Sequence, residues 1–89
     1  MIFVYVLAKI EAGTENEVLK SLKTISQVRK ASLTYGIYDL CIEGLFKSLE
    51  DLDDFVFNNV IKIPGVKETA TLVTSRSISL QPDSTISFG

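Results

Sequence analysis

The chain has 89 residues, enough for one domain that buries only roughly 60 to 65% of the surface it exposes when unfolded. Hydrophobic residues make up 46% of the sequence and charged residues 22%, which is more apolar surface than a small two-layer fold hides by itself. The net charge is −2, and the Lys and Arg residues are scattered singly, so no basic stripe is available for a nucleic acid or an anionic membrane. We therefore expect self-association, with no direct binding to nucleic acid or membrane.

The compartment is suggested by three further features. The single cysteine, Cys41, cannot form an intramolecular disulfide and fits a reducing cytosol. The apolar start of the chain lacks the basic region and the cleavage site of a signal peptide. No apolar run approaches the roughly 20 residues needed to cross a bilayer. These features predict a cytoplasmic protein.

Residues 2–10 are predicted to form a strand, because most of them are β-branched or aromatic. Alternation gives this strand two apolar faces, one with Ile2, Val4, Val6, Ala8 and Ile10 and the other with Phe3, Tyr5 and Leu7. Both faces are therefore expected to be covered.

Gly13 marks a turn, and Thr14 with Glu17 has the spacing of a capping box, so a helix is predicted from there to about Ile25. Its apolar stripe is Val18, Leu19, Leu22 and Ile25. Residues 28–35 alternate as a half-exposed edge strand should, and Gly36 then supplies a tight turn. Residues 38–46 form the next strand, with Leu40, Cys41, Ile42 and Leu45 as its apolar side chains.

Ser48 and Asp51 repeat the capping pattern and predict a second helix that ends before Pro64-Gly65. The acidic residues between 50 and 54 lie in its first turn, where they complement the helix dipole and lack the pattern of a calcium loop. The helical apolar positions are Leu49, Leu52, Phe55, Val56, Val60 and Ile63. A last strand is predicted over residues 66–75.

This order predicts an α+β domain of the ferredoxin-like βαββαβ type, a four-stranded antiparallel sheet in the order 4-1-3-2 with two helices on one face. Residues 1–76 form this domain, and residues 77–89 are a polar tail or an extra edge strand. The uncovered face is expected to carry Phe3, Tyr5, Leu7, Cys41, Leu45 and Val73. We expect Phe3, Tyr5, Leu7 and Leu45 to pack against a second copy, giving a dimeric α+β barrel.

Catalytic chemistry has little support in the sequence. The chain has no histidine, so it lacks the commonest general base, and no catalytic residue is predicted. Cys41 alone cannot form a zinc site, and the five dispersed glycines match no phosphate-binding pattern. The acidic and aliphatic third strand does not resemble an RNA-binding one. We expect no cofactor and no metal.

The predicted turn at residues 33–39 is the one segment with a concentration of functional groups, a phenol at Tyr38 and a carboxylate at Asp39. In one interpretation Asp39 only accepts hydrogen bonds from turn amides and Tyr38 only packs. In the other, the turn is part of a binding site.

This turn, Gly36-Ile37-Tyr38-Asp39, resembles the Gly-x-Tyr/Phe-Asp turn of the effector-binding (RAM) domain of Lrp/AsnC transcription regulators. Residues 63–73 resemble the same family's Pro-Gly-Val segment followed by Thr-x-Thr, and residues 4–13 resemble its opening strand. The resemblance covers about residues 1–78. Since no helix-turn-helix segment precedes the first strand, the chain looks like the stand-alone form of the domain.

The resemblance implies a homodimer formed through the sheet, assembly of dimers into an octamer or decamer ring, and binding of a small ligand, usually an amino acid, between dimers. It also implies modulation of assembly, including that of full-length Lrp/AsnC regulators. Carried over by position, the ligand-binding residues are Leu33, Gly36, Tyr38, Asp39, Thr69, Thr71 and Val73. Asp39 would hold the ligand's ammonium, the two threonines its carboxylate, and Leu33 its apolar part.

The chain departs from the family pattern at two places. Many members carry Arg between the two threonines, where this chain has Ala70, and the Ser-rich tail after Arg76 differs from the usual ending. The alternative function is that of a small dimeric α+β barrel enzyme, such as a monooxygenase or isomerase, with a cavity inside each subunit. A third is an amino-acid-binding ACT module with its ligand at a different interface.

Overall fold

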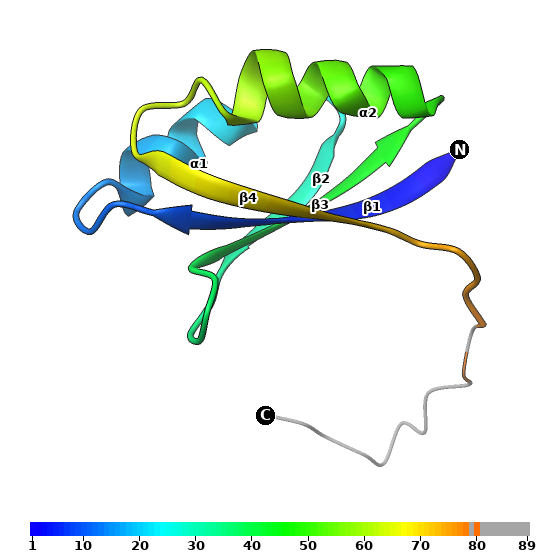
Figure 1. Ribbon diagram of the computed structural model, residues 1–89, viewed down its shortest axis with the longest axis horizontal. Helices are drawn as coiled ribbons and strands as arrows, with labels where there is room; N and C mark the ends of the chain where they lie inside the picture. Colours follow the sequence, from blue (N-terminus) through cyan, green and yellow to red (C-terminus); the bar gives the residue numbers. More distant parts are fainter. Residues whose placement is uncertain (79, 81–89) are drawn as a thin grey trace.

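The computed structural model describes residues 1–78 and 80, and its elements follow the predicted order of strand, helix, strand, strand, helix, strand (Figure 1). Four antiparallel strands form one sheet, and the second helix continues from an α-helix into a π-helix. The elements are β1 (Ile2–Ile10), α1 (Glu15–Lys23), β2 (Val28–Leu33), β3 (Leu40–Phe46), α2 (Leu49–Phe55), the π-helix η1 (Val56–Val60) and β4 (Val66–Val73).

The strands lie in the order β2-β3-β1-β4, which confirms the predicted order 4-1-3-2 with β1 and β3 at the centre. β1 pairs with β3 from Ile2 opposite Phe46 to Ala8 opposite Leu40. Its other edge pairs with β4. Both helices cover the same face of this sheet, and the hairpin between β2 and β3 projects away from them (Figure 1). On the opposite face, here called the open face, the described residues form no helix.

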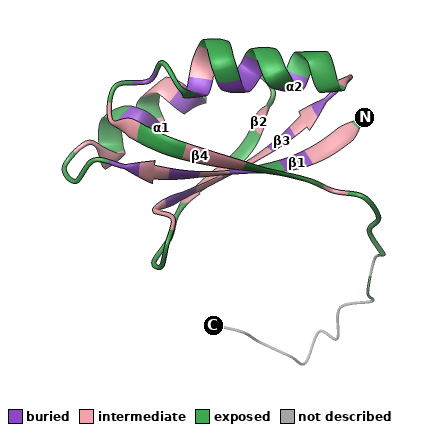
Figure 2. Ribbon diagram, in the orientation of Figure 1, coloured by how far each residue is buried: buried purple, intermediate pink, exposed green. Residues whose placement is uncertain are grey.

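The core lies between the sheet and the helices, where the buried residues of Figure 2 are found. Alternation along β1 and β3 turns every second side chain toward the helices, and the tilted rings of Phe46 and Phe55 meet there at 5.1 Å between centroids. The buried hydrophobic residues are Val4, Val6, Ala8, Ile10, Val18, Leu22, Leu40, Ile42, Phe46, Leu52, Phe55, Val56, Val60 and Ile63. Burying each large side chain stabilises the fold by about 1.5 to 3 kcal/mol.

The start of α1 differs from the predicted capping box. Thr14 precedes the helix, but its hydroxyl donates to the carbonyl of Glu11 at 2.6 Å and makes no capping bond to the helix. The hydroxyl is therefore used by the preceding turn, and the capping-box prediction is wrong. The helix also ends at Lys23, two residues before the predicted end.

The predicted cap of the second helix is confirmed, because the Ser48 hydroxyl accepts from the Asp51 amide at 3.1 Å. The α-helical pattern stops at Phe55, and the amide of Ile61 donates to the carbonyl of Val56, five residues back, at 3.0 Å. Leu49, in the first helical position, is 57% exposed and lies outside the core, contrary to the predicted apolar stripe.

Three strand ends fall inside the predicted ranges. β2 stops at Leu33 and β3 begins at Leu40, because residues 34–39 form a hairpin loop longer than predicted. β4 ends at Val73, two residues early, and the prediction for the tail 77–89 falls largely outside the described residues. Val73 lies opposite Val4 and therefore shares the helix-covered face, which corrects its predicted place on the open face. Leu72, opposite Tyr5, takes that place.

Within the described part of the chain, no helix is both long enough and apolar enough to span a membrane.

Candidate ligand site at the hairpin

The loop of residues 34–39 is held by its own hydrogen bonds. The amide of Thr34 donates to the carbonyl of Asp39 at 2.8 Å, and the Thr34 hydroxyl donates to the carbonyl of Tyr38 at 2.7 Å. Gly36 has a φ of +124°, which a side chain would strain, so glycine suits the bend. The loop therefore presents its side chains from a defined backbone.

Asp39 ties this hairpin to the end of β1. Its amide donates to the carbonyl of Ala8 at 2.9 Å, and its carboxylate oxygen Oδ2 accepts from the amide of Ile10 at 3.0 Å. The side chain thus continues the β1–β3 ladder beyond Leu40, the last paired residue of β3. This bond agrees with the interpretation of Asp39 as an acceptor for backbone amides, and it also fixes the carboxylate in space.

A pocket of about 390 Å³ opens beside this carboxylate, within the size range typical of ligand sites. Three segments meet there: the end of β1, the start of α1 and the hairpin. The lining residues are Ile10, Ala12, Glu15, Leu33, Thr34, Tyr35 and Asp39. We call this cavity the hairpin pocket.

Sequence reasoning marked only Leu33 and Asp39 among the lining residues as ligand contacts, and Glu15 is the charged lining residue that it missed. It occupies the first position of α1, and its Oε1 accepts from the Gly13 amide at 3.3 Å. In sequence, an acidic residue at a helix start is fully explained by the helix dipole. Only the approach of the hairpin to this helix end places Glu15 beside the pocket.

The other predicted ligand residues lie elsewhere in the subunit. Of the hairpin residues, Leu33 and Asp39 line the pocket, whereas Gly36 and Tyr38 do not. Tyr38 has the ammonium of Lys9 at 5.9 Å from its ring centroid, and Lys9 pairs with Glu68 of β4 at 3.6 Å. The predicted β4 residues are Thr69, Thr71 and Val73, on the edge strand that pairs with β1 and not with the hairpin. One subunit therefore does not bring the two predicted groups together.

The open face carries all four predicted dimer-interface residues. Phe3 lies opposite Leu45, Leu7 opposite Cys41 and Tyr5 opposite Leu72, so these side chains share one surface. The rings of Phe3 and Tyr5 pack edge to face at 5.1 Å. Partial burial on this face, followed by the nearby Glu43 carboxylate, raises the pKa of the Cys41 thiol, while Lys30 acts in the opposite direction. The thiol therefore remains protonated and apolar in character.

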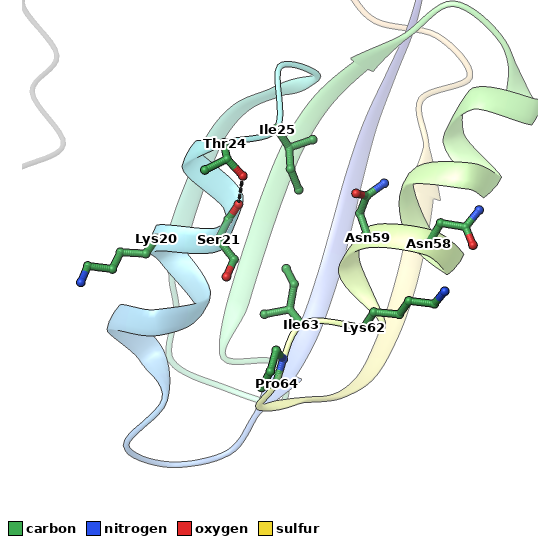
Figure 3. Close-up of a pocket in the computed structure, with 9 residues that line it drawn as sticks. All are labelled: Lys20, Ser21, Thr24, Ile25, Asn58, Asn59, Lys62, Ile63 and Pro64. Atoms are coloured by element: carbon green, nitrogen blue, oxygen red, sulfur yellow. Dashed lines mark hydrogen bonds between the residues drawn. The ribbon is translucent and has the colours of Figure 1, made fainter.

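A second groove, of about 530 Å³, lies between α1 and the end of the second helix (Figure 3). Its floor includes Ile25, Ile63 and Pro64, and the Thr24 hydroxyl donates to the Ser21 carbonyl at 2.8 Å. The side chains of Lys20 and Lys62 point away from each other in Figure 3, so they do not converge on a common ligand. The hairpin pocket, with its two carboxylates, is the better candidate.

The described residues do not meet the requirements of a metal site or of histidine-based catalysis. The described residues contain no group of three or more His, Cys, Asp and Glu side chains that could hold a metal ion. The sequence has no histidine.

Known proteins resemble this chain in both sequence and fold. The family model described as the Lrp/AsnC ligand binding domain matches residues 3–83. The HTH-type transcriptional regulator FL11 of Pyrococcus horikoshii is 29% identical over 73 residues, which cover 82% of this chain and 48% of FL11. The chain thus spans about half the length of this relative.

Two solved structures extend the comparison. FFRP-DM1 superposes with a TM-score of 0.79 at 32% identity, covering 83% of this chain and 99% of that one. The transcriptional regulator NMB0573 of Neisseria meningitidis, solved as a complex with L-Met, has a TM-score of 0.83 at 14% identity over 89% of this chain and 53% of that one, a likeness of fold alone. With the family model matching nearly the whole sequence, the chain belongs to the Lrp/AsnC ligand-binding domain family.

Proposed function

We propose that this domain is a ligand-sensing and oligomerisation module that binds an amino acid in the hairpin pocket, where a neighbouring dimer completes the site. The observation that carries the proposal is the fixed carboxylate of Asp39 in a pocket of about 390 Å³, within a domain whose family is defined by ligand binding. An α-ammonium group needs such an acceptor, and the half-exposed Leu33 beside it supplies apolar contact.

A second copy is needed for two reasons. The open face brings together aromatic and aliphatic side chains of β1, β3 and β4, including the 36% exposed Tyr5 and the 54% exposed Leu72, and such a patch is typical of an interface. The hairpin tip also exposes Tyr35 at 107% and Ile37 at 78%, which is costly unless another chain covers them. We assign the open face to the homodimer and the hairpin tip to contacts between dimers that build an octamer or decamer ring.

The placement of β4 fits this arrangement. Thr69, Thr71 and Val73 lie on the opposite sheet edge from β2 and do not line the hairpin pocket of their own subunit, so in this proposal they reach a hairpin pocket from another subunit. In the proposed ring the hydroxyls of Thr69 and Thr71 bind the ligand's carboxylate, while Asp39 binds its ammonium.

Regulation follows from mass action. A ligand that binds only the assembled ring stabilises it and shifts the population toward it. Because FL11 is a transcriptional regulator, we propose that the module acts in the cytoplasm by co-assembling with full-length regulators of its family. It has no catalytic role in this proposal.

The oligomeric part is tested by light scattering with Leu7→Glu, which places a charge on the open face. Leu49→Glu is the matched control, because Leu49 is 57% exposed at the start of α2, where an added carboxylate is favourable. We expect Leu7→Glu to be monomeric at concentrations at which the wild type and the control are dimers or rings. Should Leu7→Glu unfold, Leu72→Glu at the 54% exposed edge replaces it. A monomeric wild type would refute the proposed self-association.

The ligand part is tested by isothermal titration of the wild type and Asp39→Asn against the twenty amino acids, with light scattering of the same samples. We expect at least one amino acid to bind, to increase the assembled fraction, and to lose affinity in Asp39→Asn. Binding that is unchanged by Asp39→Asn would place the ligand outside the hairpin pocket. A stable dimer with no amino-acid response, and a ligand inside each subunit, would instead favour the enzyme alternative.

A further inference from the structure

The hairpin pocket carries more negative charge than a simple amino acid requires. Two of its lining residues, Glu15 and Asp39, are carboxylates, and none of the seven lining residues is Lys, Arg or His. Asp39 accepts one backbone hydrogen bond through Oδ2 and Glu15 one through Oε1, which leaves the second oxygen of each carboxylate able to accept from a ligand.

Within the described residues, neither Glu15 nor Asp39 forms an ion pair with a cation. Among residues 1–78 and 80, the ion pair found is Lys9 with Glu68, which does not involve the pocket. Closing the pocket under a neighbouring dimer would therefore take two carboxylates out of water together. Each desolvated carboxylate without a partner costs free energy, so a ligand with a single positive charge leaves one of them uncompensated.

The two carboxylates reach the pocket from different elements, with apolar surface also on its wall. Asp39 comes from the hairpin and Glu15 from the start of α1, and Ile10, Ala12 and Leu33 line the same cavity. An aliphatic chain with a cation at each end matches this arrangement in both charge and polarity. A divalent metal ion matches it poorly, because Ca²⁺ takes six to eight oxygen ligands and the pocket has two carboxylates.

Resting on the proposed function, we infer that the hairpin pocket selects amino acids with a cationic side chain, of the lysine, ornithine or arginine kind. Asp39 holds the α-ammonium, and Glu15 holds the side-chain cation. The apolar residues contact the methylene groups between them, and Glu15 is the residue that sets specificity.

The test compares L-lysine with L-norleucine, which has the same chain length without the terminal ammonium, by isothermal titration of the full chain in the presence of EDTA. We expect L-lysine to bind about tenfold tighter or more, since one charge-assisted contact is worth on the order of 1.4 kcal/mol or more. Glu15→Gln keeps an acceptor for the Gly13 amide. It should weaken the binding of L-lysine and leave the binding of L-norleucine unchanged. Glu17→Gln, a neighbouring acidic residue of α1 outside the pocket, is the matched control.

The outcomes separate this inference from the function on which it rests. If L-norleucine binds as tightly as L-lysine and both weaken in Asp39→Asn, the amino-acid site stands and the selectivity is refuted. The selectivity is refuted as well if Glu15→Gln leaves the preference for L-lysine intact. If Asp39→Asn changes the binding affinity of no amino acid, the proposed function itself fails. A preference for L-lysine that disappears in Glu15→Gln and persists in Glu17→Gln supports the inference.

Discussion

Replacing Asp39 separates the structural contribution of its carboxylate from its contribution to binding. The bond from the Ile10 amide to Asp39 is 3.0 Å long and partly buried, and hydrogen bonds to charged groups contribute about 1.5 to 3 kcal/mol. Because water can reach part of the site, we expect Asp39→Ala to lower the free energy of unfolding by about 1.5 to 2 kcal/mol. Asp39→Asn keeps a carbonyl oxygen for the same amide, so its loss should be about 0.5 to 1 kcal/mol.

Urea unfolding followed by circular dichroism measures both losses, with all variants at one protein concentration because association adds to the apparent stability. Thr34→Val is a useful comparison, since it removes the hydroxyl bond to Tyr38 within the hairpin and leaves the bond to β1 intact. An Asp39→Ala variant as stable as the wild type would refute the assignment of Asp39 as the tie between hairpin and β1. Equal losses for Ala and Asn would show that charge, and not acceptor geometry, matters.

Three other changes are expected to have defined effects. Gly65→Ala should lower the free energy of unfolding by about 2 to 4 kcal/mol, and Gly13→Ala should lower it by about 1 kcal/mol. Both glycines have a positive φ, but only at Gly65 would a Cβ collide with Thr14. Equal losses of the two variants in thermal unfolding would contradict this. Ser48→Ala should cost about 1 kcal/mol through loss of the α2 cap, and an unchanged urea midpoint would show that the cap is dispensable. The raised pKa of Cys41 means that the folded state holds the thiol proton more tightly than the unfolded state, so the free energy of unfolding should fall as pH rises past the ordinary thiol pKa of 9.0. In Cys41→Ala the free energy of unfolding should fall less over the same pH range. Identical pH profiles for the wild type and Cys41→Ala would refute this.

Local patterns were sufficient for most of the fold. The two apolar faces of residues 2–10 predicted a central strand, and the alternation of residues 28–35 predicted an edge strand; the structure has β1 at the centre and β2, which ends at Leu33, at an edge. The Ser48 cap and the Pro64-Gly65 stop bounded the second helix because capping and chain breaking depend on near neighbours in sequence. The Thr14 cap failed for a related reason: the same hydroxyl had a second local partner, Glu11, and sequence does not show which bond prevails.

The candidate site was predicted from the sequence less completely than the fold. The resemblance to the Lrp/AsnC family marked Leu33, Gly36, Tyr38 and Asp39, and the structure places Leu33 and Asp39 beside one pocket that Gly36 and Tyr38 do not line. It did not mark Glu15, which is distant in sequence and has an ordinary explanation at a helix start. The resemblance also grouped Thr69, Thr71 and Val73, from the same or an adjacent subunit, with the turn, and within one subunit they lie on β4, at the opposite sheet edge from β2.

The sequence by itself thus determined the elements, their order in the sheet and the presence of a second apolar face on the sheet, because periodicity and caps act over a few residues. Tertiary structure alone decided that Asp39 bonds to Ile10, that Val73 shares a face with Val4, and that Glu15 meets the hairpin. Each of these depends on the register of strands and on the approach of distant segments. A shift of one residue in the strand register moves every side chain of the strand to the other face of the sheet, and no local sequence pattern determines the register.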